Sequence, residues 1–150
     1  MRHVTATVEL DASPERVWAA LVDTAGQAAW NPFITSITGT LTVGERLTVR
    51  IAPPGGKPMT FRPTVTDVQP PHHLAWLGHL GVPGLFDGAH TFSLTPLPDG
   101  RTQLVQSEQF SGALVWISRS LLAKTQAGFE AMHGALAAEL SKRQSPRSVP

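Results

Sequence analysis

The 150-residue chain carries twelve lysines and arginines against eleven aspartates and glutamates, and it has no cysteine. Its length fits one domain, and its formal charge of +1 without a basic run argues against nucleic-acid binding, which needs a concentrated basic surface. The missing cysteines exclude disulfides, thiolate zinc sites and a cysteine nucleophile.

The first predicted elements are a strand and two short helices. Apolar and polar residues alternate over 3–10, which is typical of a strand. Ser13 is a suitable N-cap for a helix that begins with Pro14. A second short helix is expected over 24–29, and Pro32 ends it because the residue before a proline avoids helical geometry.

Six short strands are predicted between residues 34 and 110, separated by turns rich in proline and glycine. Their expected ranges are 34–39, 45–52, 59–68, 74–80, 89–97 and 102–110. Consecutive strands joined by short turns form an antiparallel meander. Together with the N-terminal strand, they predict a curved antiparallel sheet of seven strands.

The C-terminal part predicts one long helix over 115–141, roughly 40 Å long at 1.5 Å per residue. Its apolar stripe does not run all round, so the helix has to lie on the sheet. The stripe consists of Leu114, Ile117, Leu121, Met132, Leu136 and Leu140. The tail 144–150 is rich in serine and proline and is expected to be disordered, which leaves one α+β domain over 1–143. A curved sheet with one covering helix favours an apolar pocket between them.

Several short motifs support a family resemblance. SPERVW at 13–18, WNPF at 30–33, GFEAM at 128–132 and the long terminal helix resemble the SRPBCC or START/Bet v 1-like superfamily, over about residues 3–142. They are most similar to a polyketide cyclase/dehydrase-like branch of largely uncharacterised bacterial proteins. The resemblance implies a helix-grip fold with a deep hydrophobic cavity, but no single activity. In that branch Asn often stands where this chain has His133.

One pair of polar residues is a candidate for catalysis. If the turn at 98–100 is a hairpin tip, His90 faces Glu108, and Trp76 comes beside His90 on the next strand. A carboxylate beside an imidazole suits an acid/base pair in the cavity. It equally suits a structural pair on a half-buried face. Arg50 or Arg62 could also pair with Glu108, and His79 and Arg62 are further candidates for the acid/base chemistry.

The candidate ligand-binding residues are mostly apolar. Trp30 and Phe33 flank the Asn-Pro corner, where they either form a gate at the cavity mouth or pack the end of the barrel. The other candidates lie on predicted inward faces and suit an adaptable pocket as well as an ordinary core. They are Met59, Phe61, Trp76, Phe86, Phe92, Phe110, Leu121, Thr125, Phe129 and Met132.

No metal site and no cofactor are expected. His72 and His73 are adjacent on a strand, so they point to opposite faces, and His79 and His90 have no evident third ligand. The N-terminal alternation does not look like a signal peptide, and no apolar stretch is long enough to span a membrane. We therefore expect a cytoplasmic monomer or homodimer without membrane insertion.

Three functions remain open. The preferred hypothesis is binding of a small hydrophobic or amphipathic molecule, as lipid-binding relatives do, between sheet and helix. The first alternative is a polyketide cyclase, aromatase or dehydratase, a lyase or isomerase without a covalent intermediate, that uses cavity acid/base residues. The second alternative is a chaperone-activator-like interaction module, which would need an exposed apolar patch.

Overall fold

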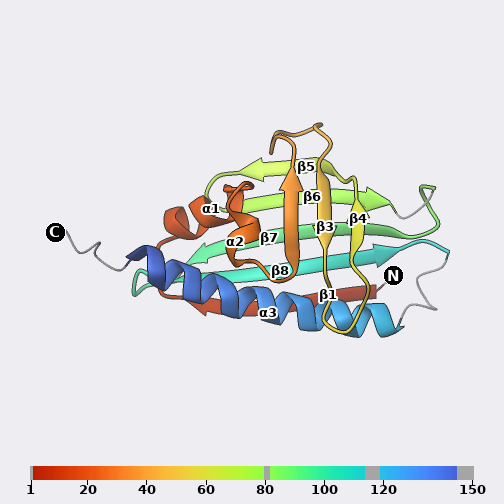
Figure 1. The fold of residues 1–150 in the computed structure, drawn as a ribbon. Coiled ribbons are helices and arrows are strands. Elements are labelled where there is room, and N and C mark those ends of the chain that lie inside the picture. Colours follow the sequence, from red (N-terminus) through yellow and green to blue (C-terminus); the bar gives the residue numbers. More distant parts are fainter. Residues whose placement is uncertain (1, 80–81, 114–118, 145–150) are drawn as a thin grey trace.

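The computed structural model describes residues 2–79, 82–113 and 119–144 (Figure 1). In chain order the elements are β1 (Arg2–Leu10), α1 (Pro14–Val22), α2 (Gln27–Trp30), β2 (Ile34–Thr38), β3 (Thr48–Ile51), β4 (Met59–Phe61), β5 (Thr64–Gln69), β6 (His73–His79), β7 (Asp87–Pro96), β8 (Thr102–Ser111) and α3 (Arg119–Gln144).

The strands of the described residues form two antiparallel sheets. The larger has the order β1-β8-β7-β6-β5, and the smaller has the order β2-β3-β4. In Figure 1 the smaller sheet crosses steeply in front of the larger one, while α3 runs along β1. This α+β arrangement fits a helix-grip fold. The prediction of seven strands in a single sheet was wrong, since eight strands lie in two sheets.

The extra strand comes from a break at Pro63. The sequence predicted one strand over 59–68, but Pro63 lacks the N–H that a ladder needs, and it separates β4 from β5. The Pro63 carbonyl accepts a hydrogen bond from the Leu47 amide (2.8 Å), and an isolated bridge joins Arg46 to Thr64. The chain therefore leaves the small sheet and enters the large one at this proline.

The predicted helices differ from the observed ones mainly at their ends. Ser13 caps α1 as expected, because its hydroxyl accepts from the Arg16 amide at 3.3 Å. The short helix is α2 rather than 24–29, since the Asp23 carboxylate accepts from the Gly26 amide and holds a turn there. The expected helix start at 115–118, the stripe residues Leu114 and Ile117, residue 80 and the tail 145–150 lie outside the described residues.

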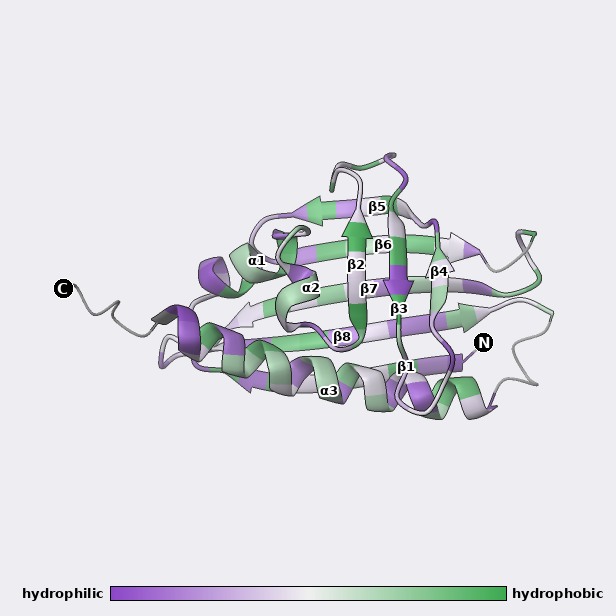
Figure 2. Ribbon diagram, viewed as in Figure 1, coloured by the Kyte–Doolittle hydropathy of each residue, from purple (hydrophilic) through white to green (hydrophobic). Residues whose placement is uncertain are grey.

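The buried face of α3 joins the helix to the rest of the molecule. Its buried residues lie along one face and are Thr125, Gly128, Phe129, Met132, His133, Leu136 and Leu140. Figure 2 shows hydrophobic and hydrophilic positions along the whole helix. Near its C-terminal end, the Leu140 carbonyl accepts a hydrogen bond from the Arg16 guanidinium of α1 (3.1 Å). No helix within the described ranges has the length and apolar character that a bilayer span requires.

A candidate ligand cavity between the two sheets and the C-terminal helix

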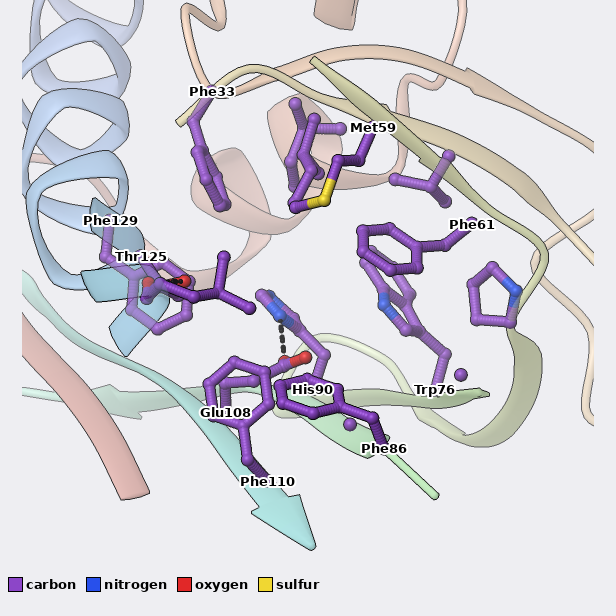
Figure 3. A pocket seen from close by; sticks show the side chains of 17 residues that line it. Phe33, Met59, Phe61, Trp76, Phe86, His90, Glu108, Phe110, Thr125 and Phe129 are labelled. Atoms are coloured by element: carbon purple, nitrogen blue, oxygen red, sulfur yellow. Dashed lines mark hydrogen bonds and ion pairs between the residues drawn. The ribbon is translucent and has the colours of Figure 1, made fainter. Parts of the chain in front are cut away.

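A largely apolar cavity lies where the small sheet faces β6, β7 and β8, with α3 as a side wall (Figure 3). Its volume, counted as the space that the centre of a water molecule can occupy, is about 60 Å³. At roughly 10–15 Å³ for each water, this is room for about four to six waters, or for a compact ligand with one ring. The cavity was expected between one sheet and the helix; both sheets contribute to it.

Most of the predicted ligand-binding residues line this cavity. They are Phe33, Met59, Phe61, Trp76, Phe86, Phe110, Leu121, Thr125 and Phe129, and the candidate catalytic residues His90 and Glu108 line it too. Three predicted residues, Trp30, Phe92 and Met132, are not part of the lining. Figure 3 shows the lining side chains converging from the small sheet, the large sheet and α3.

The three residues outside the lining pack in the surrounding core. The Phe92 ring lies 4.7 Å from the His90 ring and 5.6 Å from the Trp76 ring, measured between centroids. Met132 is fully buried, and its sulfur accepts from the Gln106 amide (3.6 Å). Trp30 is partly buried against the core, which fits its alternative interpretation as packing, and among the described side chains its buried Nε1 alone lacks a partner.

Sequence reasoning missed six lining residues: Ile34, Val49, Ile51, Pro63, Gly78 and Gly88. The two glycines were within reach of the predicted register, because they pair with each other two residues from the Trp76–His90 pair. Residues two apart on a strand share a face. A glycine there leaves space that a side chain would fill. At Gly88 a Cβ atom would lie 2.5 Å from Glu108 Oε1.

The predicted pairing of Trp76, His90 and Glu108 across the large sheet is confirmed. His90 Nδ1 lies 2.6 Å from Glu108 Oε2, and the two side chains are 6% and 16% exposed. Arg50 and Arg62 are exposed and form no ion pair with Glu108.

His79 lies outside the cavity lining, with its Nδ1 2.6 Å from Asp87 Oδ1. Its hydrogen bond holds the pKa of Asp87 below the usual range of an aspartate. The Asp87 carboxylate also accepts from the Gly84 amide (3.1 Å), which fixes the chain on either side of Phe86. His79 therefore helps to place a lining residue and does not face a ligand.

Aromatic rings fix the orientation of His90. The Trp76 ring stacks on it, with centroids 5.0 Å apart and planes at 13°. Phe129 of α3 approaches it edge-on, at 5.4 Å and 85°. Contacts on two sides leave the imidazole little freedom to rotate, so its two nitrogens keep fixed partners.

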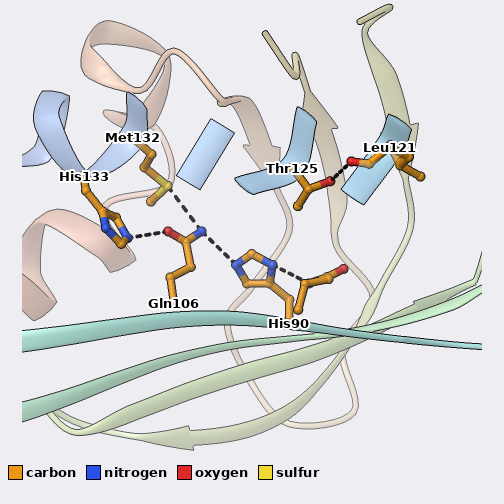
Figure 4. A network of polar contacts seen from close by, with 7 residues as sticks. His90, Gln106, Leu121, Thr125, Met132 and His133 are labelled. Carbon is orange, nitrogen blue, oxygen red and sulfur yellow. Dashed lines mark hydrogen bonds and ion pairs between the residues drawn. The ribbon is translucent and has the colours of Figure 1, made fainter. Parts of the chain in front are cut away.

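Those partners form a buried chain of polar contacts that ends at Glu108 (Figure 4). Gln106 Nε2 lies 3.1 Å from His90 Nε2, and Gln106 Oε1 lies 2.9 Å from His133 Nε2. An amide nitrogen only donates and an amide oxygen only accepts. His90 Nε2 is therefore an acceptor, His90 carries its proton on Nδ1, and His133 carries its proton on Nε2. Every donor in the chain points toward Glu108 Oε2.

His133 is a neutral member of this chain. The side chain is 5% exposed, and burial lowers its pKa to about 4, although the charge of Glu130 opposes this shift. At neutral pH it thus donates one proton to Gln106 and carries no charge.

The Asn-Pro corner places Phe33 in the cavity. The buried Asn31 side chain accepts from the Phe33 amide (2.9 Å) and the Ile34 amide (3.0 Å), and it donates to Gln27 Oε1 (2.8 Å). Phe33 then meets Phe129 of α3 edge-on, with centroids 5.7 Å apart. The motif around Asn31 therefore fixes one wall of the cavity.

A second hollow adjoins the cavity. It shares Met59 and Leu121 with the cavity, and it is lined further by Pro53, Gly56, Lys57, Ser120 and Lys124. It is wider, with about 330 Å³ for the centre of a water molecule. Met59 and Leu121 thus stand between the apolar interior and a more polar vestibule.

No group of three histidine, cysteine, aspartate or glutamate side chains in the described ranges is placed to hold a metal ion. The polar side chains of the cavity itself are those of His90, Glu108 and Thr125. The chemistry available there is hydrogen bonding and proton transfer by a carboxylate and its histidine partner.

Comparison with known proteins agrees with this architecture. A family model described as polyketide cyclase / dehydrase and lipid transport matches residues 1–141. No curated protein matches the chain. Among solved structures, the Zhui aromatase/cyclase of Streptomyces sp. R1128 has 20% identity and a TM-score of 0.79, with 99% of both chains covered.

Two further structures are similar. A START superfamily protein of Mycobacterium smegmatis has 20% identity and a TM-score of 0.75, covering 95% of this chain and 99% of that one. A Mesorhizobium loti protein has 24% identity and a TM-score of 0.73, covering 96% and 99%. At these identities the structures establish a shared fold, while the family model covers nearly the whole chain. The chain therefore belongs to the polyketide cyclase / dehydrase and lipid transport family.

Proposed function

We propose that this protein binds a small hydrophobic or amphipathic molecule, in the cytoplasm, in the cavity between its two sheets and α3. The observation that carries the proposal is the apolar cavity, in which the centre of a water molecule can occupy about 60 Å³. Aromatic and aliphatic side chains from the two sheets and α3 form its walls. Such concave apolar sites with a few polar groups are typical of ligand binding. The family description, which includes lipid transport, supports the same class of function.

The cavity size sets the first test. Toluene, a one-ring hydrocarbon, should bind to the purified protein in calorimetry or ligand-observed NMR. The variant Thr125→Phe adds four heavy atoms from α3 and should abolish that binding, because they fill about the available space. Ala137→Phe, at an exposed position of the same helix, is the matched control and should bind like the wild type. Absence of toluene binding in the wild type, or equal binding in Thr125→Phe, would contradict the proposal.

An enzyme of the cyclase or dehydratase type is the second candidate, favoured by the Glu108 carboxylate in the cavity wall. Because both nitrogens of His90 already have partners, Glu108 is the group available as a general base. Native mass spectrometry of protein from its own host should identify a bound molecule. If that molecule is converted, Glu108→Gln should slow conversion by about a hundredfold or more. Unchanged conversion in this variant would remove the enzyme hypothesis.

The interaction-module hypothesis has little support in the described surface. The large apolar side chains exposed there are Val43, Val82 and Leu85. They come from two separate loops, and they are few for a docking patch.

A further inference from the structure

We propose that Glu108 selects ligands that carry a hydroxyl group, which it binds through its oxygen Oε1, with His90, Gln106 and His133 as positioning residues. This inference rests on the proposed binding function, since it names the chemical class of the ligand for the same cavity. It also gives His90 a positioning role in place of the acid/base role, which was one of the two that the sequence left open.

In the buried chain every nitrogen of His90 already has a hydrogen-bond partner. His133 donates to Gln106, Gln106 donates to His90, and His90 donates to Glu108 Oε2 at 2.6 Å. His90 therefore has neither a free proton nor a free lone pair for a ligand.

The other polar side chains of the cavity, those of Thr125 and Glu108, differ in how their hydrogen-bonding atoms are used. The Thr125 hydroxyl donates to the Leu121 carbonyl within its own helix (2.8 Å). Glu108 Oε1 receives no hydrogen bond from any side chain or amide of the described residues. It lies over Gly88, at a point where a Cβ atom would come within 2.5 Å. Gly88 thus makes room for the Glu108 carboxylate, and Oε1 is the carboxylate oxygen that lacks a donor among the described residues.

The number of acceptors in the cavity limits how many polar hydrogens a ligand can bring. A buried polar hydrogen without an acceptor costs binding free energy. A hydroxyl brings one hydrogen and matches one free carboxylate oxygen, whereas an ammonium brings three. The surrounding walls are mostly apolar, with Phe86, Phe110 and Phe129 among them. Among the described lining side chains the Thr125 hydroxyl oxygen is the one further acceptor, so an ammonium meets fewer acceptors than its three hydrogens require. The site therefore suits a phenol or an alcohol better than an amine.

The experiment uses probes that match in size and differ in one group. Phenol donates a hydrogen bond, toluene replaces that hydroxyl by a methyl group, benzaldehyde only accepts, and benzylamine carries an ammonium at neutral pH. Dissociation constants are measured by calorimetry for the wild type, for Glu108→Gln and for Glu45→Gln, an exposed control. In Glu108→Gln, His90 still donates to the amide oxygen, so the amide nitrogen is left to face the ligand.

In the wild type, phenol should bind more tightly than benzaldehyde and benzylamine. In Glu108→Gln, phenol should weaken by about tenfold and benzaldehyde should strengthen by about tenfold, as expected for gaining or losing a partnered buried polar group. Toluene should stay within about twofold, which shows that the cavity is intact. Glu45→Gln should match the wild type for every probe.

The possible failures are distinguishable. If toluene and phenol both fail to bind the wild type, the proposed function and this inference fall together. If toluene binds but the order of phenol and benzaldehyde is the same in wild type and Glu108→Gln, only the inference is wrong. Tighter binding of benzylamine than of phenol would likewise overturn the choice of a hydroxyl.

The positioning role of His90 has its own readout. His90→Asn retains a donor near the position of Nδ1 and should keep the phenol-to-toluene affinity ratio within about twofold. His90→Leu removes that donor and should lower the ratio by about two- to tenfold, the effect of one lost hydrogen bond. Equal ratios in both variants, with toluene still bound, would show that His90 does not position Glu108.

Discussion

At the scale of single residues, the Glu108 carboxylate owes its position to a glycine, Gly88, against which it packs. Gly78 and Gly88 pair across β6 and β7, next to the Trp76–His90 pair. A Cβ atom at Gly88 would lie 2.5 Å from Glu108 Oε1, whereas one at Gly78 would meet the Pro63 side chain at an ordinary 3.6 Å. The same residue type in the same row of the sheet thus has different consequences for the carboxylate.

Gly88→Ala should therefore displace the Glu108 carboxylate, and Gly78→Ala should not. We expect the phenol-to-toluene affinity ratio to fall by about tenfold in Gly88→Ala, as it does when a buried polar partner is lost. Gly78→Ala narrows the cavity and should lower both affinities together, so that their ratio stays within about twofold of the wild type. Calorimetry with the two probes measures this; equal ratios in the two alanine variants would contradict the role assigned to Gly88.

His133 makes stability depend on pH. Its pKa is about 4 in the folded protein and near 6.5 in the unfolded chain. Between these values the unfolded chain binds a proton that the folded protein does not, so stability falls as pH falls from about 6.5 to about 4. The shift corresponds to a loss of up to about 3 kcal/mol over that window.

His133→Gln keeps a donor for Gln106 and removes the titration, so denaturant unfolding at pH 7 and pH 4.5 should differ less for this variant than for the wild type. His3→Gln, at an exposed position of β1, serves as the control and should retain the wild-type difference. The assignment fails if His133→Gln loses as much stability at pH 4.5 as the wild type does.

At the scale of elements, the position of α3 against the corner before β2 depends on a second close approach. A Cβ atom at Gly128 would lie 2.3 Å from the Phe33 ring, while one at Gly134 in the same helix would meet nothing within 4 Å. Phe33 is buried and also packs edge-on against Phe129. Gly128 thus allows the helix to contact a ring that forms part of the cavity wall.

Alanine at these two helix positions should have opposite effects. Gly134→Ala should raise the free energy of unfolding by up to about 1 kcal/mol, the ordinary gain in helix propensity. Gly128→Ala should lower it by about 1–3 kcal/mol, because a packed ring has to move. Urea unfolding of both variants tests this. Stabilisation by Gly128→Ala would show that Phe33 is not held against the helix.

The sequence predicts those features of the fold that neighbouring residues determine, and it does not predict those that depend on residues far apart in the chain. The turn at 98–100 sets the pairing of Leu94 with Leu104 and of His90 with Glu108, so the register of β7 and β8 followed from local residues. The division into two sheets did not, because one proline in an alternating stretch also fits an edge strand. What separates the sheets is the non-local pairing of Pro63 with Leu47.

The candidate site was predictable in the same uneven way. Aromatic residues on inward strand positions indicated most of the cavity wall, since alternation fixes the face that each one occupies. The contact between Gln106 and His133 was not predictable, because these residues lie on β8 and α3 and meet only after the helix has packed. The sequence thus predicted the contact of His90 with Glu108 but not the second contact, in which Gln106 occupies the other nitrogen of His90.

At the scale of the whole molecule, the two sheets that enclose the cavity differ in the length and pairing of their strands. β7 and β8 are ten residues long and are paired on both edges. β4 has three residues and lies at the edge of its sheet, where β3 is its one partner among the described strands. Short strands with few neighbours open at lower free energy than long central ones. Room for a ligand larger than one ring should therefore come from movement of the small sheet.

Naphthalene, with two rings, exceeds the space for about four to six waters, whereas toluene matches it. Hydrogen exchange measured by mass spectrometry should therefore change with naphthalene in β3 and β4, which carry Val49, Ile51, Met59 and Phe61 on the cavity wall. Toluene should cause a smaller change there, and the amides of β7 and β8 should keep their protection with either probe, because both strands are held on two sides. Exchange that increased in β7 and β8 while β3 and β4 stayed the same would place the adaptable wall in the large sheet instead.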